Sequence, residues 1–141
     1  MARSVERGLA LGPWAMTGER VQQYLKAVGD TSSLYFEARL APPLALAAYA
    51  VGAFLEKLNL PPGTIHSIQE METLAPISFG EVISGTLRVG RPKRLGERQF
   101  ISATFALVNG KGQKVLIATS TVAVPASFQP GREESRLAPG R

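Results

Sequence analysis

The uncharged stretch from Leu40 to Leu55 places the strongest constraint on the fold of the chain. Pro42 and Pro43 stand near its start, and proline fits the first turn of a helix because the amides of that turn have no partner within the helix. Apolar residues then occupy every face as far as about Leu58, before the sequence NLPPG stops the helix. A helix that is apolar on all sides is typically buried. The rest of the chain must therefore supply a layer that encloses it.

Strands are the layer that the sequence predicts. Four runs rich in Val, Ile, Thr and Phe follow the helix and favour β-strands: residues 64–74, 81–89, 99–108 and 115–124. Asn109-Gly110 lies between the last two runs and is a strong hairpin pattern. We expect an antiparallel meander that curves around the helix. Within the helix, Gly52 costs about 1 kcal/mol relative to alanine, so we expect it to permit a close approach by the sheet or by a ligand.

The remaining segments fit a single domain, residues 1–125. A short strand is expected near Leu9 to Leu11. Thr17 is a suitable N-cap for an amphipathic helix over residues 19–28, and Gly29 is placed to end that helix. Pro125 ends the last strand, and we interpret residues 126–141 as a flexible tail.

The composition excludes several kinds of site. The chain has no cysteine, which excludes disulfides and thiolate metal sites. Its one histidine, His66, leaves little room for zinc, so we expect no metal. We find neither a signal peptide nor the roughly 20 apolar residues that span a membrane, and we expect a cytoplasmic protein without membrane contact. The net charge of +5 suits a nucleic acid or an anionic small molecule, but no nucleic-acid-binding pattern is present, and we expect no nucleic-acid partner.

Three segments in this order resemble the MaoC-like hot-dog hydratases and dehydratases. They are a helix that runs into a Gly-Asp turn (YLKAVGDTSSLY), a central helix with an Ala-Pro entrance (LAPPLALAAYAVGAFL), and a proline-loop-glycine-acid approach to a long strand (ISFGEVISGTLRV). The final hairpin, VNGKGQKVLIATSTVAV, is also similar. The resemblance covers about residues 17–125. It implies an α+β hot-dog fold, in which a curved antiparallel β-sheet wraps around a central apolar α-helix.

The resemblance also implies an acid–base pair, formed by the aspartate of the turn and a histidine a few residues later. In the family this pair activates water for addition to an enoyl thioester, or catalyses the reverse elimination. Asp30 stands at the position of the aspartate, but Tyr35 stands where the histidine belongs. In the family a glycine amide at the helix entrance polarises the thioester carbonyl. The position of that glycine is taken by Pro43, which has no N–H. Asp30 and Tyr35 are therefore the candidate catalytic residues, and Ala41 and Pro43 are candidate substrate-binding residues.

Each of these residues also has an ordinary structural interpretation. Asp30 is a common turn residue after a helix, and Tyr35 would serve as a wall of the core. A basic cluster, Arg88, Arg91 and Lys93 with Arg94, is a candidate binding site for the phosphates of a coenzyme A thioester, or the solvated tip of a hairpin. His66 is either a hydrogen-bonded strand residue or a group that approaches a site across a dimer interface.

Three functions remain open at this stage. The first is a hydratase or dehydratase of enoyl or 3-hydroxyacyl thioesters in fatty acid metabolism that uses Asp30. The second is a non-catalytic acyl-thioester-binding partner of a complete hot-dog chain, and the missing histidine and Pro43 favour it. The third is a hot-dog acyl-CoA thioesterase, for which Glu56 is the only acid in the central helix. In each case the substrate is carried by coenzyme A or a carrier protein, and no separate cofactor is expected. A lone curved sheet leaves an edge exposed, so we expect a homodimer or a heterodimer with another hot-dog chain.

Overall fold

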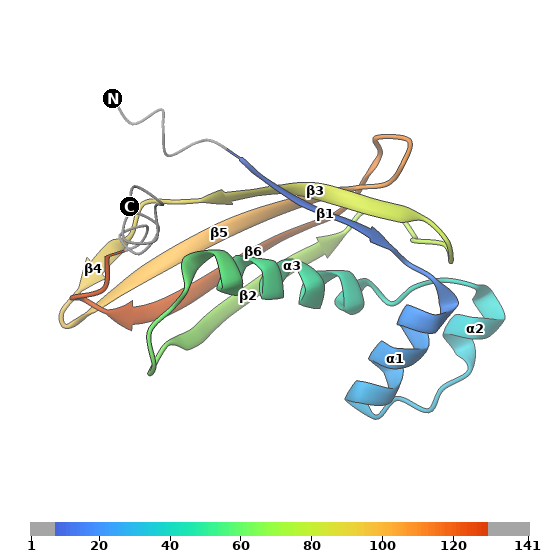
Figure 1. The fold of residues 1–141 in the computed structure, drawn as a ribbon, viewed down its shortest axis with the longest axis horizontal. Helices are drawn as coiled ribbons and strands as arrows, with labels where there is room; N and C mark the ends of the chain where they lie inside the picture. The colour runs from blue at the N-terminus through green and yellow to red at the C-terminus, as the bar shows by residue number, and fades with distance from the viewer. Residues whose placement is uncertain (1–7, 130–141) are drawn as a thin grey trace, which may run out of the picture.

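The computed structural model describes residues 8–129, which form a six-stranded sheet and three helices (Figure 1). In chain order the elements are β1 (Leu9–Ala15), α1 (Gly18–Val28), α2 (Leu34–Ala38), α3 (Pro43–Leu58), β2 (Ile65–Thr73), β3 (Val82–Val89), β4 (Lys93–Leu95), β5 (Arg98–Val108) and β6 (Lys114–Pro125). The four long strands and two of the helices lie within one or two residues of their predicted bounds. The five-residue helix α2 and the three-residue strand β4 had no counterpart in the prediction.

The sheet is antiparallel, with the strand order β1-β3-β5-β6-β2, and β4 pairs with β5. The predicted meander is therefore wrong, because β2 and β3 do not pair but lie on opposite sides of the β5–β6 hairpin. Their connection is hydrogen-bonded to the segment before α3. The Ala41 amide donates to the carbonyl of Ile77 at 2.7 Å, and the Phe79 amide donates to the carbonyl of Arg39 at 3.0 Å.

Helix α3 lies lengthwise against one face of the sheet, while α1 and α2 stand together at one end (Figure 1). The rings of Phe54 in α3 and Phe105 in β5 meet edge to face with their centroids 6.0 Å apart, and both side chains are fully buried. The buried residues of α3 are Ala45, Leu46, Ala47, Ala50 and Phe54. This arrangement confirms the predicted α+β fold with a central apolar helix.

The prediction that α3 is buried on every side is wrong within this chain. The sheet covers one face only, and Leu44 is 58% exposed while Leu55 is 37% exposed. Ala48 and Gly52 are also exposed. No described atom lies within 4 Å of the position that a Cβ would take at Gly52, so neither the sheet nor another described segment approaches this glycine. We define the exposed apolar residues Leu44, Ala48, Gly52 and Leu55, spaced by three or four positions, as the α3 stripe.

Local sequence sets the ends of the first helix as predicted. The hydroxyl of Thr17 accepts a hydrogen bond from the Arg20 amide at 3.2 Å, and Gly29 ends the helix in the left-handed region with φ of 74°. None of the described helices is both long and apolar enough to cross a membrane.

The predicted flexible tail begins as an ordered segment. The amide of Ala126 donates to the carbonyl of Glu97 at 2.9 Å, and the side chain of Gln99 donates to the carbonyl of Ala126 at 3.3 Å. Phe128 packs against the core. The other part of that tail, residues 130–141, lies outside the described residues.

Candidate active site

A cavity of about 680 Å³ lies between α2, the start of α3 and the segment that follows β2. It is lined by Asp30, Ser32, Leu34, Tyr35, Ala38, Leu40, Ala41, Pro43 and residues 73–77. Four of the predicted site residues, Asp30, Tyr35, Ala41 and Pro43, therefore meet at one cavity. Among the described residues that line it, Asp30 alone has a charged side chain. We call this space the Asp30 cavity.

A second hollow of about 580 Å³ adjoins the Asp30 cavity. The two share four lining residues: Asp30, Tyr35, Pro43 and Thr73. The second hollow extends between α1 and β2, where Tyr24, Val28 and Met71 contribute to its wall. Asp30 and Tyr35 thus stand at a partition, with an apolar space on either side.

The backbone of Asp30 is fixed by the end of α1. Because Gly29 adopts a left-handed conformation, the Asp30 amide turns back and donates to the carbonyl of Leu25 at 2.9 Å. The Oδ1 atom of Asp30 accepts a hydrogen bond from the Ser32 amide at 2.8 Å, which closes a local turn. The carboxylate thus has a structural role in the turn and also contributes to the lining of the cavity.

Tyr35 is presented by the short helix α2. This helix ends at Arg39, which is left-handed with φ of 55°, and the Leu40 amide donates to the carbonyl of Tyr35 at 3.0 Å. The Tyr35 side chain is partly buried and packs against the core. Tyr35 therefore forms part of the wall of the core, which is the structural interpretation given above. It also lines the cavity that Asp30 lines.

Tyr24 lines the second hollow, and the sequence analysis did not identify it as a site residue. It was assigned only to the apolar face of α1, although it is the one member of that face, among Val21, Tyr24, Leu25 and Val28, with a polar tip. Burial, followed by the nearby Tyr35 and Asp30 groups, raises the pKa of Tyr24 above its ordinary value of 10. Its hydroxyl is therefore a hydrogen-bond donor at neutral pH.

The entrance of α3 offers few backbone donors. The Ala41 amide is already bonded to Ile77, and the Ala45 amide donates to the carbonyl of Pro42 at 3.0 Å. Pro42 and Pro43 have no N–H. Within residues 41–45, the Leu44 amide is the first that this helix end can present to a ligand, so the position of the family's glycine provides no oxyanion donor.

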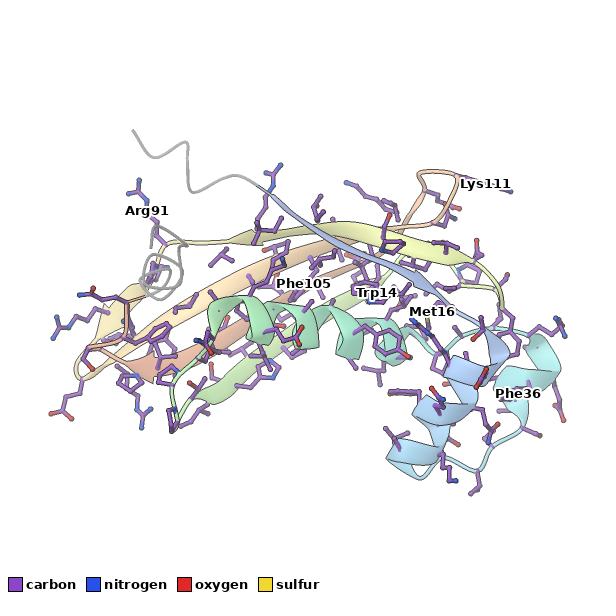
Figure 2. The ribbon with its side chains drawn as sticks, viewed as in Figure 1. Trp14, Met16, Phe36, Arg91, Phe105 and Lys111 are labelled. Atoms are coloured by element: carbon purple, nitrogen blue, oxygen red, sulfur yellow. The ribbon has the colours of Figure 1, made fainter. Side chains whose placement is uncertain are left out.

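The basic cluster is not part of the Asp30 cavity. Arg88 lies on β3 opposite Thr104, and Lys93 lies on β4 opposite Phe100. Arg91 stands at the far end of the sheet from α2, on which Phe36 is labelled (Figure 2). Within this chain these residues are therefore separated from Asp30, and their role in binding phosphates stays a prediction.

His66 is also remote from Asp30 within the chain. It lines a hollow of about 530 Å³ at the C-terminal end of α3, together with Leu55 and Glu56. The Asp30 cavity lies at the N-terminal end of the same helix. The imidazole therefore does not replace the missing histidine within one chain.

Comparisons with known proteins were made for the whole chain. No family model matches it. It is 27% identical over 135 residues to a UPF0336 protein from Clavibacter michiganensis subsp. michiganensis, an alignment that covers 82% of this chain and 88% of the relative.

Three solved structures illustrate the structural likeness. The R-hydratase PhaJ1 from Pseudomonas aeruginosa has a TM-score of 0.68 at 18% identity, covering 89% of this chain and 88% of its own. The MaoC-like dehydratase from Rhodospirillum rubrum has a TM-score of 0.67 at 16% identity, covering 88% and 94%. The HadBC complex of Mycobacterium tuberculosis, a 3R-hydroxyacyl-ACP dehydratase, contains a chain with a TM-score of 0.60 at 16% identity, covering 83% and 96%. These likenesses confirm that the chain has the hot-dog fold of the MaoC-like hydratases and dehydratases.

Proposed function

We propose that this chain is the acyl-thioester-binding subunit of a MaoC-like hydratase or dehydratase built from two different hot-dog chains. In this assembly the partner supplies the complete aspartate–histidine pair, and this chain supplies a cavity for the acyl group. The observation that carries the proposal is the Asp30 cavity itself, where Tyr35 and Pro43 take the places of a base and of an amide donor.

The missing groups matter because of the chemistry of hydration. Water adds its hydroxyl group to C3 of an enoyl thioester and a proton to C2, so one group must take a proton and another must return one. Tyrosine has an ordinary pKa near 10 and histidine one near 6.5, so Tyr35 is a poor base at neutral pH. The negative charge that develops on the thioester oxygen also needs a donor, and removal of one such donor costs about 10²- to 10³-fold in rate.

The lining of the Asp30 cavity suits an acyl chain. Beyond Asp30, Ser32, Tyr35 and Thr73 its walls are apolar, and they include Leu34, Ala38, Leu40, Leu74 and Ile77. Each methylene group transferred from water to such a surface contributes about 0.8 kcal/mol. We therefore assign the apolar wall to the acyl group and the rim that carries Asp30 to the thioester.

The heteromeric arrangement has support from the comparisons. One of the structures with the same fold is a chain of the HadBC complex, which is a 3R-hydroxyacyl-ACP dehydratase. This chain shares that fold and lacks a histidine near Asp30, which is the pattern that a supporting subunit would show.

The thioesterase alternative has less support. It needs a carboxylate on the central helix that faces the substrate. Glu56 lies near the C-terminal end of α3, is exposed, and lines the hollow that contains His66 and not the Asp30 cavity.

Turnover of a short enoyl-CoA, followed by the loss of its conjugated absorbance, tests the proposal. The purified chain alone should bind the thioester in calorimetry but show no hydration, and hydration should appear when a hot-dog chain with an intact aspartate–histidine pair is added. Hydration by the chain alone that disappears in Asp30→Asn would show a self-sufficient hydratase. Thiol release from a saturated acyl-CoA would show a thioesterase instead.

A further inference from the structure

The second hollow, which adjoins the Asp30 cavity, contains a hydrogen-bond donor that no described residue uses. Tyr24 lines this hollow from α1, and its side chain is partly buried against the core. No group among residues 8–129 forms a hydrogen bond with its hydroxyl. A hydroxyl that loses contact with water needs another partner to avoid a loss of free energy. The side chain is therefore suited to hold a ligand that presents an acceptor.

The end of α1 places Tyr24 near Asp30. Val21 and Leu25 are buried, so the face of α1 that also carries Tyr24 is turned toward the core. The chain reverses at Gly29, and the Asp30 amide donates to the carbonyl of Leu25 at 2.9 Å. This reversal returns Asp30 to the last turn of α1, and both residues line the second hollow.

The polar side chains of the second hollow divide into two groups. Asp30, Tyr35 and Thr73 line both this hollow and the Asp30 cavity, so they stand at the boundary between the two spaces. Among the described polar side chains that line the second hollow, Tyr24 alone belongs to this hollow only. A ligand whose acyl group fills the Asp30 cavity crosses the boundary at its thioester and then passes Tyr24.

The chemistry of the thioester restricts which group can hold its carbonyl oxygen. This oxygen accepts hydrogen bonds, and the carboxylate of Asp30 is likewise an acceptor. Pro43 in the same wall has no N–H. Thr73 is exposed, so water competes for its hydroxyl, whereas the side chains of Tyr24 and Tyr35 are partly buried. The donor is therefore a phenol, and Tyr24 is the one on the side toward which the thioester leaves the acyl cavity.

We propose that the hydroxyl of Tyr24 donates a hydrogen bond to the carbonyl oxygen of the bound acyl thioester, and that the second hollow holds the thioester end of this ligand. The inference rests on the proposed function, which assigns the acyl group to the Asp30 cavity. The hydroxyl supplies the donor that the α3 entrance does not provide at Pro43. The other lining residues of the hollow are apolar, and a hydrogen bond is stronger in such surroundings than in water.

The protonation state of Tyr24 agrees with this role. Its pKa is raised above 10, first by burial and then by the nearby Tyr35 and Asp30 groups. The hydroxyl therefore keeps its proton at neutral and mildly alkaline pH and can donate it to an acceptor.

A pair of ligands that differ only at the carbonyl tests the assignment. Calorimetry would measure the Kd of hexanoyl-CoA and of its thioether analogue S-hexyl-CoA, in which a methylene group replaces the carbonyl. We expect Tyr24→Phe to weaken binding of the thioester at least about threefold and to leave binding of the thioether unchanged. A purely structural role of Tyr24 would weaken both ligands equally, and that result would overturn the proposal.

Two further variants locate the donor. Tyr49→Phe is the matched control, because Tyr49 is a partly exposed tyrosine of α3 that is not among the described residues lining either space. It should leave the ratio of the two Kd values as it is in the unaltered chain. Tyr35→Phe should change this ratio less than Tyr24→Phe does. A ratio that changes in Tyr35→Phe and not in Tyr24→Phe would place the donor at Tyr35 and overturn the proposal.

Infrared spectroscopy of hexanoyl-CoA labelled with ¹³C at its carbonyl gives a second readout. A hydrogen bond lowers the carbonyl stretching frequency, so this frequency should be lower in the complex with the unaltered chain than in the complex with Tyr24→Phe. Equal frequencies in the two complexes would contradict the Tyr24 contact while leaving acyl-thioester binding intact. If neither ligand binds to the unaltered chain, the proposed function fails and this inference fails with it.

Discussion

Asp30 and Tyr35 line the same two cavities, although one lies in the turn after α1 and the other in α2. The Schellman-type end of α1 fixes the backbone of Asp30, and α2 carries Tyr35. Both residues thus border the same space, with a phenol where the resemblance places an imidazole. The two residues therefore meet at one cavity of a hot-dog fold, and the phenol at this place underlies the proposed non-catalytic role.

Restoring the imidazole tests this relationship directly. The variant Tyr35→His should gain enoyl-CoA hydration of at least tenfold over the unaltered chain, because a positioned general base contributes about 10²- to 10⁴-fold. The rate should rise with pH through the pKa of the new histidine, near 6.5. The matched control is Tyr49→His, which changes a partly exposed tyrosine of α3 outside the cavity.

The same variant should remain slower than a complete hydratase, because Pro43 leaves the thioester oxygen without an amide donor. Adding Pro43→Gly to Tyr35→His should raise the rate further, by about 10-fold or more. If neither variant gains hydration activity while circular dichroism confirms that it is folded, Asp30 has only a structural role in the turn after α1.

Filling the Asp30 cavity should weaken acyl-thioester binding. Ala38 is an exposed lining residue of α2, so tryptophan at this position would occupy space without disturbing the core. We expect Ala38→Trp to raise the Kd for a long acyl-CoA by roughly tenfold, and to affect a short acyl-CoA less, since the loss grows with each displaced methylene group. Ala10→Trp is the matched control on β1. Equal effects on both chain lengths would place the acyl group elsewhere.

The ionisation of Tyr24 should report on its neighbours. Its pKa lies above 10, chiefly through burial, so its neutral form stabilises the fold below pH 10 and this stabilisation is lost as the pH rises through the folded-state pKa. Ultraviolet titration, taken as the difference between the unaltered chain and Tyr24→Phe, would isolate this transition. Asp30→Asn should lower the midpoint by removing a negative neighbour but leave it above 10. If Asp30→Asn leaves the titration midpoint of Tyr24 unchanged, the carboxylate of Asp30 does not interact with the Tyr24 hydroxyl.

The sequence predicted the part of the site that lies within a short span of chain. The span from residue 30 to residue 43 contains Asp30, Tyr35, Ala41 and Pro43 within 14 consecutive positions. Local patterns determine the backbone path of this span, such as Gly29 at a helix end and Pro43 at a helix start. The cavity walls from Thr73 to Ile77 come from a distant segment, whose place depends on hydrogen bonds to Arg39 and Ala41. No periodicity reveals such contacts.

The other errors of the prediction also concern long-range pairing. The composition of the strands indicates that they form a sheet, but not that β3 pairs with β5 and leaves β2 at the edge. The apolar character of α3 indicates burial without saying what buries it. The structure shows that the sheet of this chain covers only one face of α3.

Gly85 and Gly52 are expected to respond in opposite ways to substitution by alanine. At Gly85 on β3 an added Cβ would collide with the carbonyl oxygen of Ala106 on β5, so Gly85→Ala should lower the free energy of unfolding by about 1–3 kcal/mol. At Gly52 an added Cβ meets no described atom within 4 Å, so Gly52→Ala should raise the stability of the isolated chain by about 1 kcal/mol through helix propensity. Urea denaturation of both variants measures the two effects in one experiment. If Gly52→Ala destabilises the isolated chain, some part of this chain already packs on the α3 stripe, and the stripe is not open to a partner.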